Sequence, residues 1–300
     1  EWEEDDILLN ATGGTKPMSI AAYEVFRTFD KPVFYVHPEK DRLIWMSPLG
    51  DSVDLADRIR LREFLQAYGA VRIEAGQTHG VPEPIRQLTE ELIRHIDQYA
   101  DSLSTLNYYA AQSDNNTITS PPIDKLYSDQ PMLWRLIDLF ADAGLLQEEN
   151  KRLVFPNEEA RFMVNGGWLE QHAYGTCLNI KKKTGMQDVA RSVEVDRKQG
   201  KRTVRNELDV AFLKDNRLYV IECKTRRFKN HQQKLEEGDD VLYKLDSLRD
   251  HLGGLQARAM LVSYNRLPAH HQSRAKELKI DICCYRELIN LEEKLYEWCV

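Results

Sequence analysis

The sequence predicts an α/β protein with two domains joined by a helical bridge. Three observations favour this class. Residues 7–26 have the pattern of a strand, a glycine-rich turn and a helix. Residues 203–226 have the pattern of a β-hairpin, and alternating helix and strand patterns follow it to residue 285. A chain of 300 residues with 42% hydrophobic content can also bury sizeable cores. We place the domains at residues 1–80, 81–158 and 159–300.

Composition excludes several classes of protein. The five cysteines are odd in number and form no C-x-x-C pair, which predicts reduced thiols in a cytoplasmic protein. No apolar run approaches the roughly 20 residues of a membrane span, and the acidic start EWEEDD is unlike the basic start of a signal peptide. The eight histidines show no metal-ligand spacing. We therefore expect no membrane association and no histidine metal site.

The first predicted element is a buried strand, ILLN, which leads through NATGGTK into the helix PMSIAAYEVF, with Pro17 in the first turn. A loop of this kind leaves backbone N–H groups free to bind an anion at the helix N-terminus, beside Lys16 and the hydroxyls of Thr12 and Thr15. The spacing is not that of a P-loop. A purely structural turn remains the alternative.

The next segments predict connecting structure. VFYVHPEKDRLIWMSP predicts a hairpin, IRLREFLQAYG a helix and VRIEAG a strand, and these close the first domain. Residues 84–112 predict a long amphipathic helix, and the polar stretch DNNTITSPPIDKLYSDQP predicts an exposed loop. A helix, a hairpin and a second helix, as in a winged helix, are then predicted for MLWRLIDLFADAGLL, for QEENKR with LVFP, and for the residues from Asn157 onward. Because this segment carries six acids, we interpret it as a structural bridge, with Trp134 and Phe140 in its core.

The hairpin TVRNELDVAFL-KDNR-LYVIECKTRR carries the strongest candidate site. If Asp215 and Asn216 form the turn, Asp209 faces Glu222 and Glu207 faces Lys224, and all four side chains share one face. The other face then carries Leu208, Val210 and Phe212 against Tyr219, Ile221 and Cys223. Opposed carboxylates with Cβ atoms roughly 5 Å apart repel, and a bound cation would remove that conflict. A solvated hairpin edge is the alternative interpretation.

Basic residues are concentrated around this hairpin. Residues 181–229 contain fifteen Lys or Arg against seven Asp or Glu, in a chain of net charge −7. The runs KKK at 181–183, RKQGKR at 197–202 and TRRFK at 225–229 are expected to flank the acidic cluster, as binding to a nucleic-acid backbone requires. Solvated basic loops are the alternative. Residues 239–252 then predict a helix, followed by a strand, a helix and a strand that complete the domain.

The pattern D-x(12)-E-C-K, with Glu170 upstream in GGWLEQHAY, resembles the active site of the PD-(D/E)xK restriction-like nucleases over residues 160–290. The resemblance implies that Asp209, Glu222 and the Cys223 carbonyl bind Mg²⁺ or Mn²⁺, and that Glu170 binds a second metal ion or its water. It also implies that Lys224 orients or helps to deprotonate the attacking water. Leu208 stands where the family often has Pro. Glu207 is either a further ligand or the ion-pair partner of Lys224, and we favour the second.

The order N-x-T-G-G-T-K, helix and PD-(D/E)xK domain resembles the CARF-domain nucleases of type III CRISPR antiviral defence. The implied architecture is a Rossmann-like CARF domain, of which the first strands would precede Glu1, and a C-terminal restriction-endonuclease-like domain. The implied activator is a cyclic oligoadenylate, usually the tetramer, bound across a homodimer. The implied ligand contacts are Asn10, Thr12, Gly13, Gly14, Thr15 and Lys16.

The resulting hypothesis is a gated, metal-dependent endonuclease that cleaves DNA or RNA. The residues expected to contact the nucleic acid are Arg205, Arg226, Arg227 and Lys244, although an exposed helical lysine is the simpler account of Lys244. Two alternatives remain: a constitutive restriction or repair endonuclease, which has no need of the TGGTK loop, and a ligand-binding regulator with an inactive nuclease domain. The intact Asp209, Glu222 and Lys224 argue against the second alternative.

Overall fold

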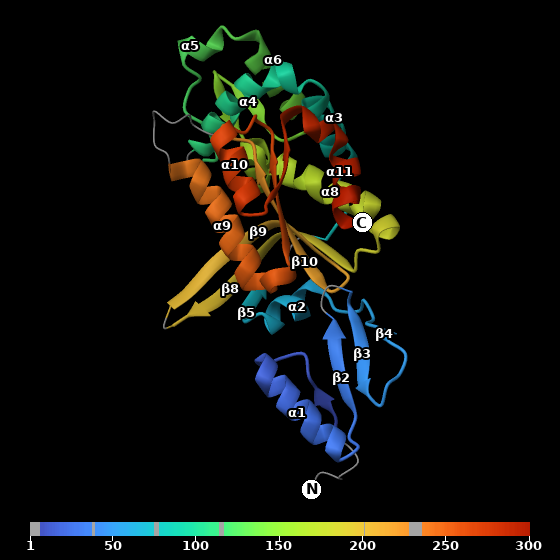
Figure 1. Cartoon of the computed structure of the whole chain (residues 1–300). Helices are drawn as coiled ribbons and strands as arrows, with labels where there is room; N and C mark the ends of the chain where they lie inside the picture. Colours follow the sequence, from blue (N-terminus) through green and yellow to red (C-terminus); the bar gives the residue numbers. More distant parts are fainter. Residues whose placement is uncertain (1–6, 38–39, 75–77, 114–116, 201, 228–235) are drawn as a thin grey trace. The chain divides into compact units, whose positions relative to one another are not determined.

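The computed structural model describes residues 7–37, 40–74, 78–113, 117–200, 202–227 and 236–300. The chain forms two compact units, residues 1–59 and residues 60–300, which are coloured along the sequence in Figure 1. The division at residue 59 precedes the boundary that we placed at residue 80. It differs because the helix and strand at residues 61–74 pack in the larger unit, and the three-domain assignment remains a prediction.

The smaller unit is a four-stranded sheet with one helix. Its elements are β1 (Leu9–Asn10), α1 (Lys16–Thr28), β2 (Val33–His37), β3 (Arg42–Ser47) and β4 (Val53–Asp54), and the strands follow one another in sequence order across the sheet. β1 and β2 are parallel and α1 connects them, whereas β2 and β3 form the predicted antiparallel hairpin. The predicted burial of the first strand is wrong at Ile7 and Leu8, which are 42% and 51% exposed, because only Leu9 and Asn10 pair with β2.

The larger unit is built on a six-stranded sheet in the order β12-β11-β10-β9-β8-β5. The strands are β5 (Ala70–Glu74), β8 (Asp188–Gln199), β9 (Arg202–Lys214), β10 (Arg217–Lys224), β11 (Arg258–Ser263) and β12 (Asp281–Cys284). The pairs from β5 to β10 are antiparallel, and the pairs from β10 to β12 are parallel. Parallel strands need crossover connections, which explains the helices between β10, β11 and β12.

Helices cover both faces of this sheet (Figure 1). One apolar core contains residues of α3 (Glu83–Arg94), α4 (Ile96–Ala111), α6 (Pro131–Asp142), α8 (Trp168–Thr184) and α11 (Leu291–Cys299). The second core contains residues of α2 (Leu61–Ala67), α9 (Glu236–Gly253) and α10 (Ala269–Glu277). Each face of the sheet thus has its own core, as in α/β folds whose strands are apolar on both sides.

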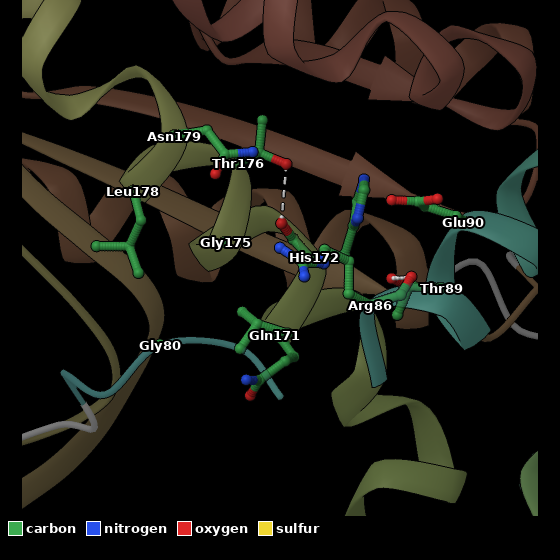
Figure 2. A pocket seen from close by; sticks show the side chains of 11 residues that line it. Gly80, Arg86, Thr89, Glu90, Gln171, His172, Gly175, Thr176, Leu178 and Asn179 are labelled. Atoms are coloured by element: carbon green, nitrogen blue, oxygen red, sulfur yellow. Dashed lines mark hydrogen bonds between the residues drawn. The ribbon is translucent and has the colours of Figure 1, made fainter. Parts of the chain in front are cut away.

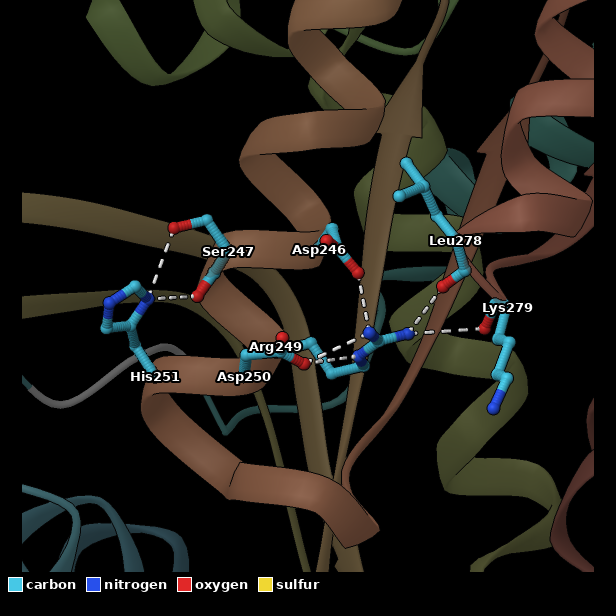
Figure 3. Close-up of polar contacts among 7 residues, drawn as sticks. All are labelled: Asp246, Ser247, Arg249, Asp250, His251, Leu278 and Lys279. Atoms are coloured by element: carbon cyan, nitrogen blue, oxygen red, sulfur yellow. Dashed lines mark hydrogen bonds and ion pairs between the residues drawn. The ribbon is translucent and has the colours of Figure 1, made fainter.

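Arg249 fastens α9 to α10 (Figure 3). Its guanidinium donates to the carbonyl oxygens of Leu278 and Lys279 at 2.8 and 3.4 Å, just after the end of α10, and to Asp246 Oδ1 at 2.5 Å. The last carbonyl groups of a helix have no partner within the helix, and a cation satisfies them well. This contact links α9 to the end of α10.

The connecting region agrees with the sequence in element order but differs in detail. The predicted long helix is divided into α3 and α4 at His95. The predicted helix, hairpin and helix are α6, β6 (Gln147–Glu149) with β7 (Arg152–Val154), and α7 (Glu158–Phe162). Phe140 is fully buried, and Trp134 packs against the same core while partly buried.

The predicted exposed loop at residues 114–131 is wrong for its central part, and its first three residues, 114–116, lie outside the described chain. Ser120 and Ile123 are 0% and 3% exposed. The Ser120 hydroxyl accepts a hydrogen bond of 2.9 Å from Leu153 N, and Ser120 N donates to Leu153 O at 2.8 Å. The segment is buried because it pairs with β7, and the short helix α5 (Lys125–Ser128) follows it.

The register of the β9–β10 hairpin is the predicted one. Pairs run from Lys214 with Arg217 to Val210 with Ile221, and the turn residues Asp215 and Asn216 have φ values of 48° and 51°. Two consecutive positive φ values define the tight hairpin turn that Asp and Asn favour. Asp209 and Glu222 are the next residues beyond the last pair.

Leu208 lies on the opposite face from the one predicted. It belongs to the core under α9, whereas Val210 and Phe212 belong to the core under α8. The alternation of side chains between the two faces of β9 is interrupted between Leu208 and Val210. At the same place the β8–β9 ladder lacks a pair between Arg191–Val210 and Val193–Leu208, and Ser192 has a φ of 52°. Such an irregularity re-aims nearby side chains, and Asp209 stands at this position.

Candidate active site

The acidic residues of the hairpin meet at the end of β10. Asp209 and Glu222 are 8% and 1% exposed. Asp209 Oδ2 accepts a hydrogen bond of 2.7 Å from Cys223 N. Glu222 Oε1 lies 2.6 Å from Lys224 Nζ and 3.8 Å from Lys244 Nζ. Glu222, not Glu207, is therefore the ion-pair partner of Lys224, and our preferred role for Glu207 is wrong.

Glu170 joins this cluster from the first turn of α8. The preceding turn, Met163–Gly167, is a π-helix with a kink at Gly166, where φ is 121°. A Cβ atom on Gly166 would stand 2.3 Å from Thr225 Oγ1, and one on Gly167 would stand 2.3 Å from the ring of Phe162. Only glycine fits both the backbone conformation and the close approach at residue 166. The two glycines therefore let the start of α8 approach the end of β10.

The carboxyl groups of the cluster are electrostatically linked. Burial, and after it the charge of Glu222, raises the pKa of Asp209 to about 7. Burial also raises the pKa of Glu170 to about 9, with contributions from Asp209 and Glu207. Burial lowers the pKa of Lys224, but Glu222 and Asp209 outweigh that effect and hold it above its usual range. Lys224 is thus a stable cation that offsets part of the acidic charge.

The donor chemistry of the cluster fits a hard divalent cation. Glu170 Oε2 and Glu222 Oε2 are buried and have no hydrogen-bond partner among the described residues. Carboxylate oxygens are the ligands that Mg²⁺ and Mn²⁺ prefer. Within the described parts of the chain, no three or more His, Cys, Asp or Glu side chains are already arranged around a common metal position. A cation here would draw the carboxylates together, because it offsets both the burial of their charges and the mutual repulsion that raise the pKa values of Asp209 and Glu170.

A pocket of about 490 Å³ opens beside the cluster. Glu170 and Lys224 line it together with two of the predicted nucleic-acid residues, Arg226 and Arg227. Arg227 forms an exposed ion pair with Asp101 of α4. Arg205 is instead bound to Asp196 and Glu194 on the β8–β9 hairpin, so neighbouring acids already compensate its charge.

The basic runs do not all flank the cluster. Lys181, Lys182 and Lys183 occupy the last turn of α8, whereas Glu170 is in its first turn, roughly 17 Å away along the axis at 1.5 Å per residue. The prediction is therefore wrong for this run. The run at 197–202 lies at the tip of the β8–β9 hairpin, with residue 201 outside the described chain. Residues 228–229 of the third run are likewise not described.

The six residues predicted to bind the activator lie together in the smaller unit. Asn10 Oδ1 accepts from Thr12 N at 3.0 Å, and Thr12 Oγ1 accepts from Val36 N at 2.7 Å. Thr15 precedes α1 as its N-cap residue, without a side-chain capping bond, and Lys16 begins the helix. All six are exposed. The loop therefore presents a helix N-terminus and a lysine to solvent, and its ligand contacts remain a prediction.

Several residues of the pocket escaped the sequence reasoning. They are Phe162, Asn165, Thr225 and Val241, and Asn107 lies behind them in a hydrogen bond with Thr225. Asn165 Oδ1 is buried and has no hydrogen-bond partner. The adjacent Gly166 and Gly167 within a helical pattern were a usable signal, because consecutive glycines there indicate a close approach. Asn107 had no such signal.

A separate cavity of about 300 Å³ is lined by other residues of α8 and by α3 (Figure 2). Thr176 Oγ1 donates to the carbonyl oxygen of His172 at 2.9 Å, and burial lowers the pKa of His172 to about 4. A histidine with this pKa is neutral near pH 7. None of the predicted catalytic residues lines this cavity, and we assign the chemistry to the pocket beside Lys224.

Comparisons with known proteins give a consistent result. The family model described as the Card1 CARF domain matches residues 1–64, and that of the Card1-like endonuclease domain matches residues 157–300. Protein VC1899 from Vibrio cholerae has a similar crystal structure, with 36% sequence identity and a TM-score of 0.85 over 98% of this chain and 75% of that chain.

A second solved structure is also similar. It is Can2 from Sulfobacillus thermosulfidooxidans in complex with cyclic tetra-adenylate. Its sequence identity is 28% and its TM-score is 0.77, over 98% of this chain and 76% of that chain. No curated protein sequence matches the chain. In the described residues, no helix is long and apolar enough to cross a membrane.

Proposed function

Because the chain belongs to the Card1 family, with a CARF domain and an endonuclease domain, we propose that it is a divalent-cation-dependent endonuclease switched on by a cyclic oligoadenylate. The observation that carries the catalytic part is the cluster of Asp209, Glu222 and Glu170. These three carboxyl groups gather beside the charged Lys224, and two of their buried oxygens have no hydrogen-bond partner in the described part of the chain. Such an arrangement is costly unless a cation binds there.

Asp209 and Glu222 are the proposed ligands of Mg²⁺ or Mn²⁺, together with the backbone carbonyl of Cys223, and Glu170 is the proposed ligand of a second ion or of its water. A bound ion lowers the pKa of a coordinated water and neutralises charge that develops on the phosphate. Glu207 adds, after burial and Asp209, to the raised pKa of Glu170, and its other predicted role, that of a further ligand, stays a prediction.

Lys224 acts in this proposal as a cation and not as a base. Its ion pair with Glu222 and its raised pKa keep it protonated at neutral pH, so it cannot accept a proton from water. It can donate a hydrogen bond to the attacking water or to a phosphate oxygen. Water attacks the phosphorus and gives up a proton to solvent or to a carboxylate of the cluster. The ester P–O bond breaks, and the leaving sugar oxygen takes a proton from solvent and departs as a hydroxyl group.

The substrate is DNA or RNA. Arg226 and Arg227 line the pocket beside Lys224, and Lys244 reaches Glu222 from α9. A guanidinium group can donate two parallel hydrogen bonds to one phosphate. Arg226 and Arg227 are therefore suited to bind backbone phosphates next to the scissile bond. Arg205 is a weaker candidate, because Asp196 and Glu194 already bind it.

The proposed activator is cyclic tetraadenylate, the ligand with which Can2 was solved. Its phosphates would face the N-terminus of α1 and Lys16, where backbone N–H groups and a positive charge favour anions. A cyclic ligand with two-fold symmetry suits a homodimer that contributes one such loop from each copy. This assignment places the protein in type III CRISPR antiviral defence, in the cytoplasm.

One assay tests the proposal. The chain is incubated with Mn²⁺ and labelled single-stranded and double-stranded DNA and RNA, with and without cyclic tetraadenylate. Cleavage should require both Mn²⁺ and the activator, and it should fall by at least about a hundredfold in Glu222→Gln, since the variant loses a charged ligand. Equal cleavage without the activator would indicate a constitutive nuclease. If no substrate is cleaved under any condition, the chain is a regulator with an inactive nuclease domain.

A further inference from the structure

A buried asparagine of the connecting region reaches the end of β10. Asn107, in α4, is 2% exposed and lies in neither of the matched ranges, 1–64 and 157–300. With its amide oriented so that nitrogen faces the carbonyl groups, Asn107 donates to Val164 O at 2.9 Å and to Leu103 O at 3.2 Å. Its oxygen then accepts from Thr225 Oγ1 at 2.9 Å. One side chain thus joins α4, the π-helical turn and the end of β10.

Thr225 is held from three sides. Its side chain packs on Gly166, where any Cβ would collide with Oγ1. Its carbonyl oxygen accepts a hydrogen bond of 2.7 Å from Asn265 Nδ2, just after β11. Its hydroxyl is bonded to Asn107, and it is only 6% exposed. The residue that follows Lys224 directly is therefore fixed by polar contacts that are shielded from water, where such bonds are costly to lose.

The same contacts span the two halves of the candidate active site. Val164 belongs to the turn that leads into α8 and so to Glu170. Thr225 belongs to the segment that carries Lys224 and, two residues before that, Glu222. The bonds of Asn107 to Val164 and Thr225 therefore link the turn that leads into the helix of Glu170 to the strand that carries Glu222. A second link, the ion pair of Asp101 with Arg227, joins α4 to the same segment.

We propose that Asn107 is a positioning residue of the endonuclease, which acts through Thr225 and Val164 on the spacing between Glu170 and Lys224. The inference rests on the proposed function of that cluster. It assigns α4 a task beyond packing: a displacement of this helix shifts the two halves of the site relative to each other. Misplacement of reacting groups by about 1 Å can cost a hundredfold in rate, so a small movement of α4 suffices to switch cleavage off.

The test compares two substitutions at Thr225 in the full chain, with Mn²⁺, cyclic tetraadenylate and a labelled strand. Thr225→Val keeps the shape but removes the hydroxyl, whereas Thr225→Ser keeps the hydroxyl. We expect kcat to fall about a hundredfold in Thr225→Val with KM changed less than about threefold, and to stay within about threefold of wild type in Thr225→Ser. Rates are measured at least 20 °C below the Tm of each variant, so that unfolding does not contribute.

Asn107→Leu provides the second arm. Ser104→Ala is its control on the same helix, because the Ser104 hydroxyl donates a hydrogen bond within α4, to Ala100 O. The loss of kcat in Asn107→Leu should equal that in Thr225→Val, and the double variant should lose no more kcat than either single variant. Ser104→Ala should keep the kcat of the wild type. If Thr225→Val does not fold, the kcat of Asn107→Leu alone tests the inference.

The inference is overturned if Thr225→Val or Asn107→Leu retains kcat within about twofold of wild type, or if Thr225→Ser loses as much as Thr225→Val. Its failure is distinguishable from failure of the proposed function. If Glu222→Gln is inactive while Thr225→Val cleaves normally, only the positioning role of Asn107 is refuted. If Glu222→Gln still cleaves, the assignment of the catalytic cluster itself is refuted.

Discussion

Asp209 Oδ2 accepts a hydrogen bond of 2.7 Å from the backbone N–H of Cys223, the residue between Glu222 and Lys224. This bond lies just beyond the last pair of the β9–β10 ladder. A carboxylate thus replaces a backbone partner at the position where the strands separate. It fixes Asp209 beside Glu222 despite their repulsion. Burial of the Asp209 carboxyl group, together with that repulsion, is the source of the pH dependence expected below.

Stability without metal should fall as pH rises. Asp209 has a pKa of about 7 in the folded chain, against about 3.9 in an unfolded chain. Between these values the unfolded state binds fewer protons, so the free energy of unfolding decreases with increasing pH, and the contribution present below about pH 4 is lost through pH 7. One pKa unit corresponds to about 1.4 kcal/mol.

Urea denaturation in EDTA at a series of pH values from 5 to 8 measures this dependence. The free energy of unfolding should fall less steeply with pH in Asp209→Asn, because the asparagine cannot ionise. At pH 8, Mn²⁺ should restore stability to the wild type. If wild type and Asp209→Asn show the same slope, the carboxyl group is not the source of the effect.

Gly166→Ala should destabilise the chain by about 2–4 kcal/mol, because the new methyl group meets Thr225 and φ is 121°. Gly185→Ala is the matched control: its φ is 75°, but nothing lies within 4 Å of the added Cβ. It should cost about 1–2 kcal/mol from backbone strain alone. Chemical denaturation of both variants measures the difference, and equal costs would contradict the tight contact at Gly166.

Nucleic acid should compete with α4 for Arg227. The Asp101–Arg227 ion pair is exposed, at 85% and 52% of the two side chains, and exposed pairs are weak. Asp101→Asn should therefore tighten binding of a labelled strand at low salt, by roughly two- to fivefold. Arg227→Gln should weaken binding and reduce the slope of log K against log salt by about 0.7–0.9, the value for one phosphate contact.

These affinities are measured by fluorescence anisotropy over a salt series, in the Glu222→Gln background so that the strand is not cleaved. Lys182→Gln, at the distant end of α8, serves as the control and should leave the slope unchanged. Tighter binding of the strand by Lys182→Gln, or unchanged affinity in Asp101→Asn, would argue against a phosphate position at Arg227.

Lys16→Ala should raise the Kd for cyclic tetraadenylate by about tenfold, since a charged contact at a helix N-terminus contributes about 1.4 kcal/mol or more. Calorimetric titration measures this value. Cleavage at saturating activator should be preserved, because Lys16 is in the smaller unit and the catalytic cluster is in the larger one. Lys40→Ala, an exposed lysine of the same unit, is the control. Unchanged affinity in Lys16→Ala would remove the TGGTK loop from the ligand site.

Local patterns were sufficient for the β9–β10 hairpin. The Asp215–Asn216 turn favours positive φ, and apolar side chains alternate on both strands, so register follows from residues near one another in the sequence. The same reasoning placed Asp209 next to Glu222. It failed at Leu208, because the irregularity at Ser192 belongs to a neighbouring strand, and it chose Glu207 for Lys224, where the ion pair is with Glu222.

Contacts between distant segments decided the rest. Asn107 and Thr225 are 118 residues apart and bond at 2.9 Å, and no periodicity of either segment encodes that meeting. The lysines at 181–183 looked close to the acids in sequence but lie at the far end of α8. Residue types and short-range spacing specify which chemistry the chain can perform, because ligand preference and strand register are local properties. Packing of helices on the sheet decides which charges meet, because it depends on side chains that only the folded chain brings together.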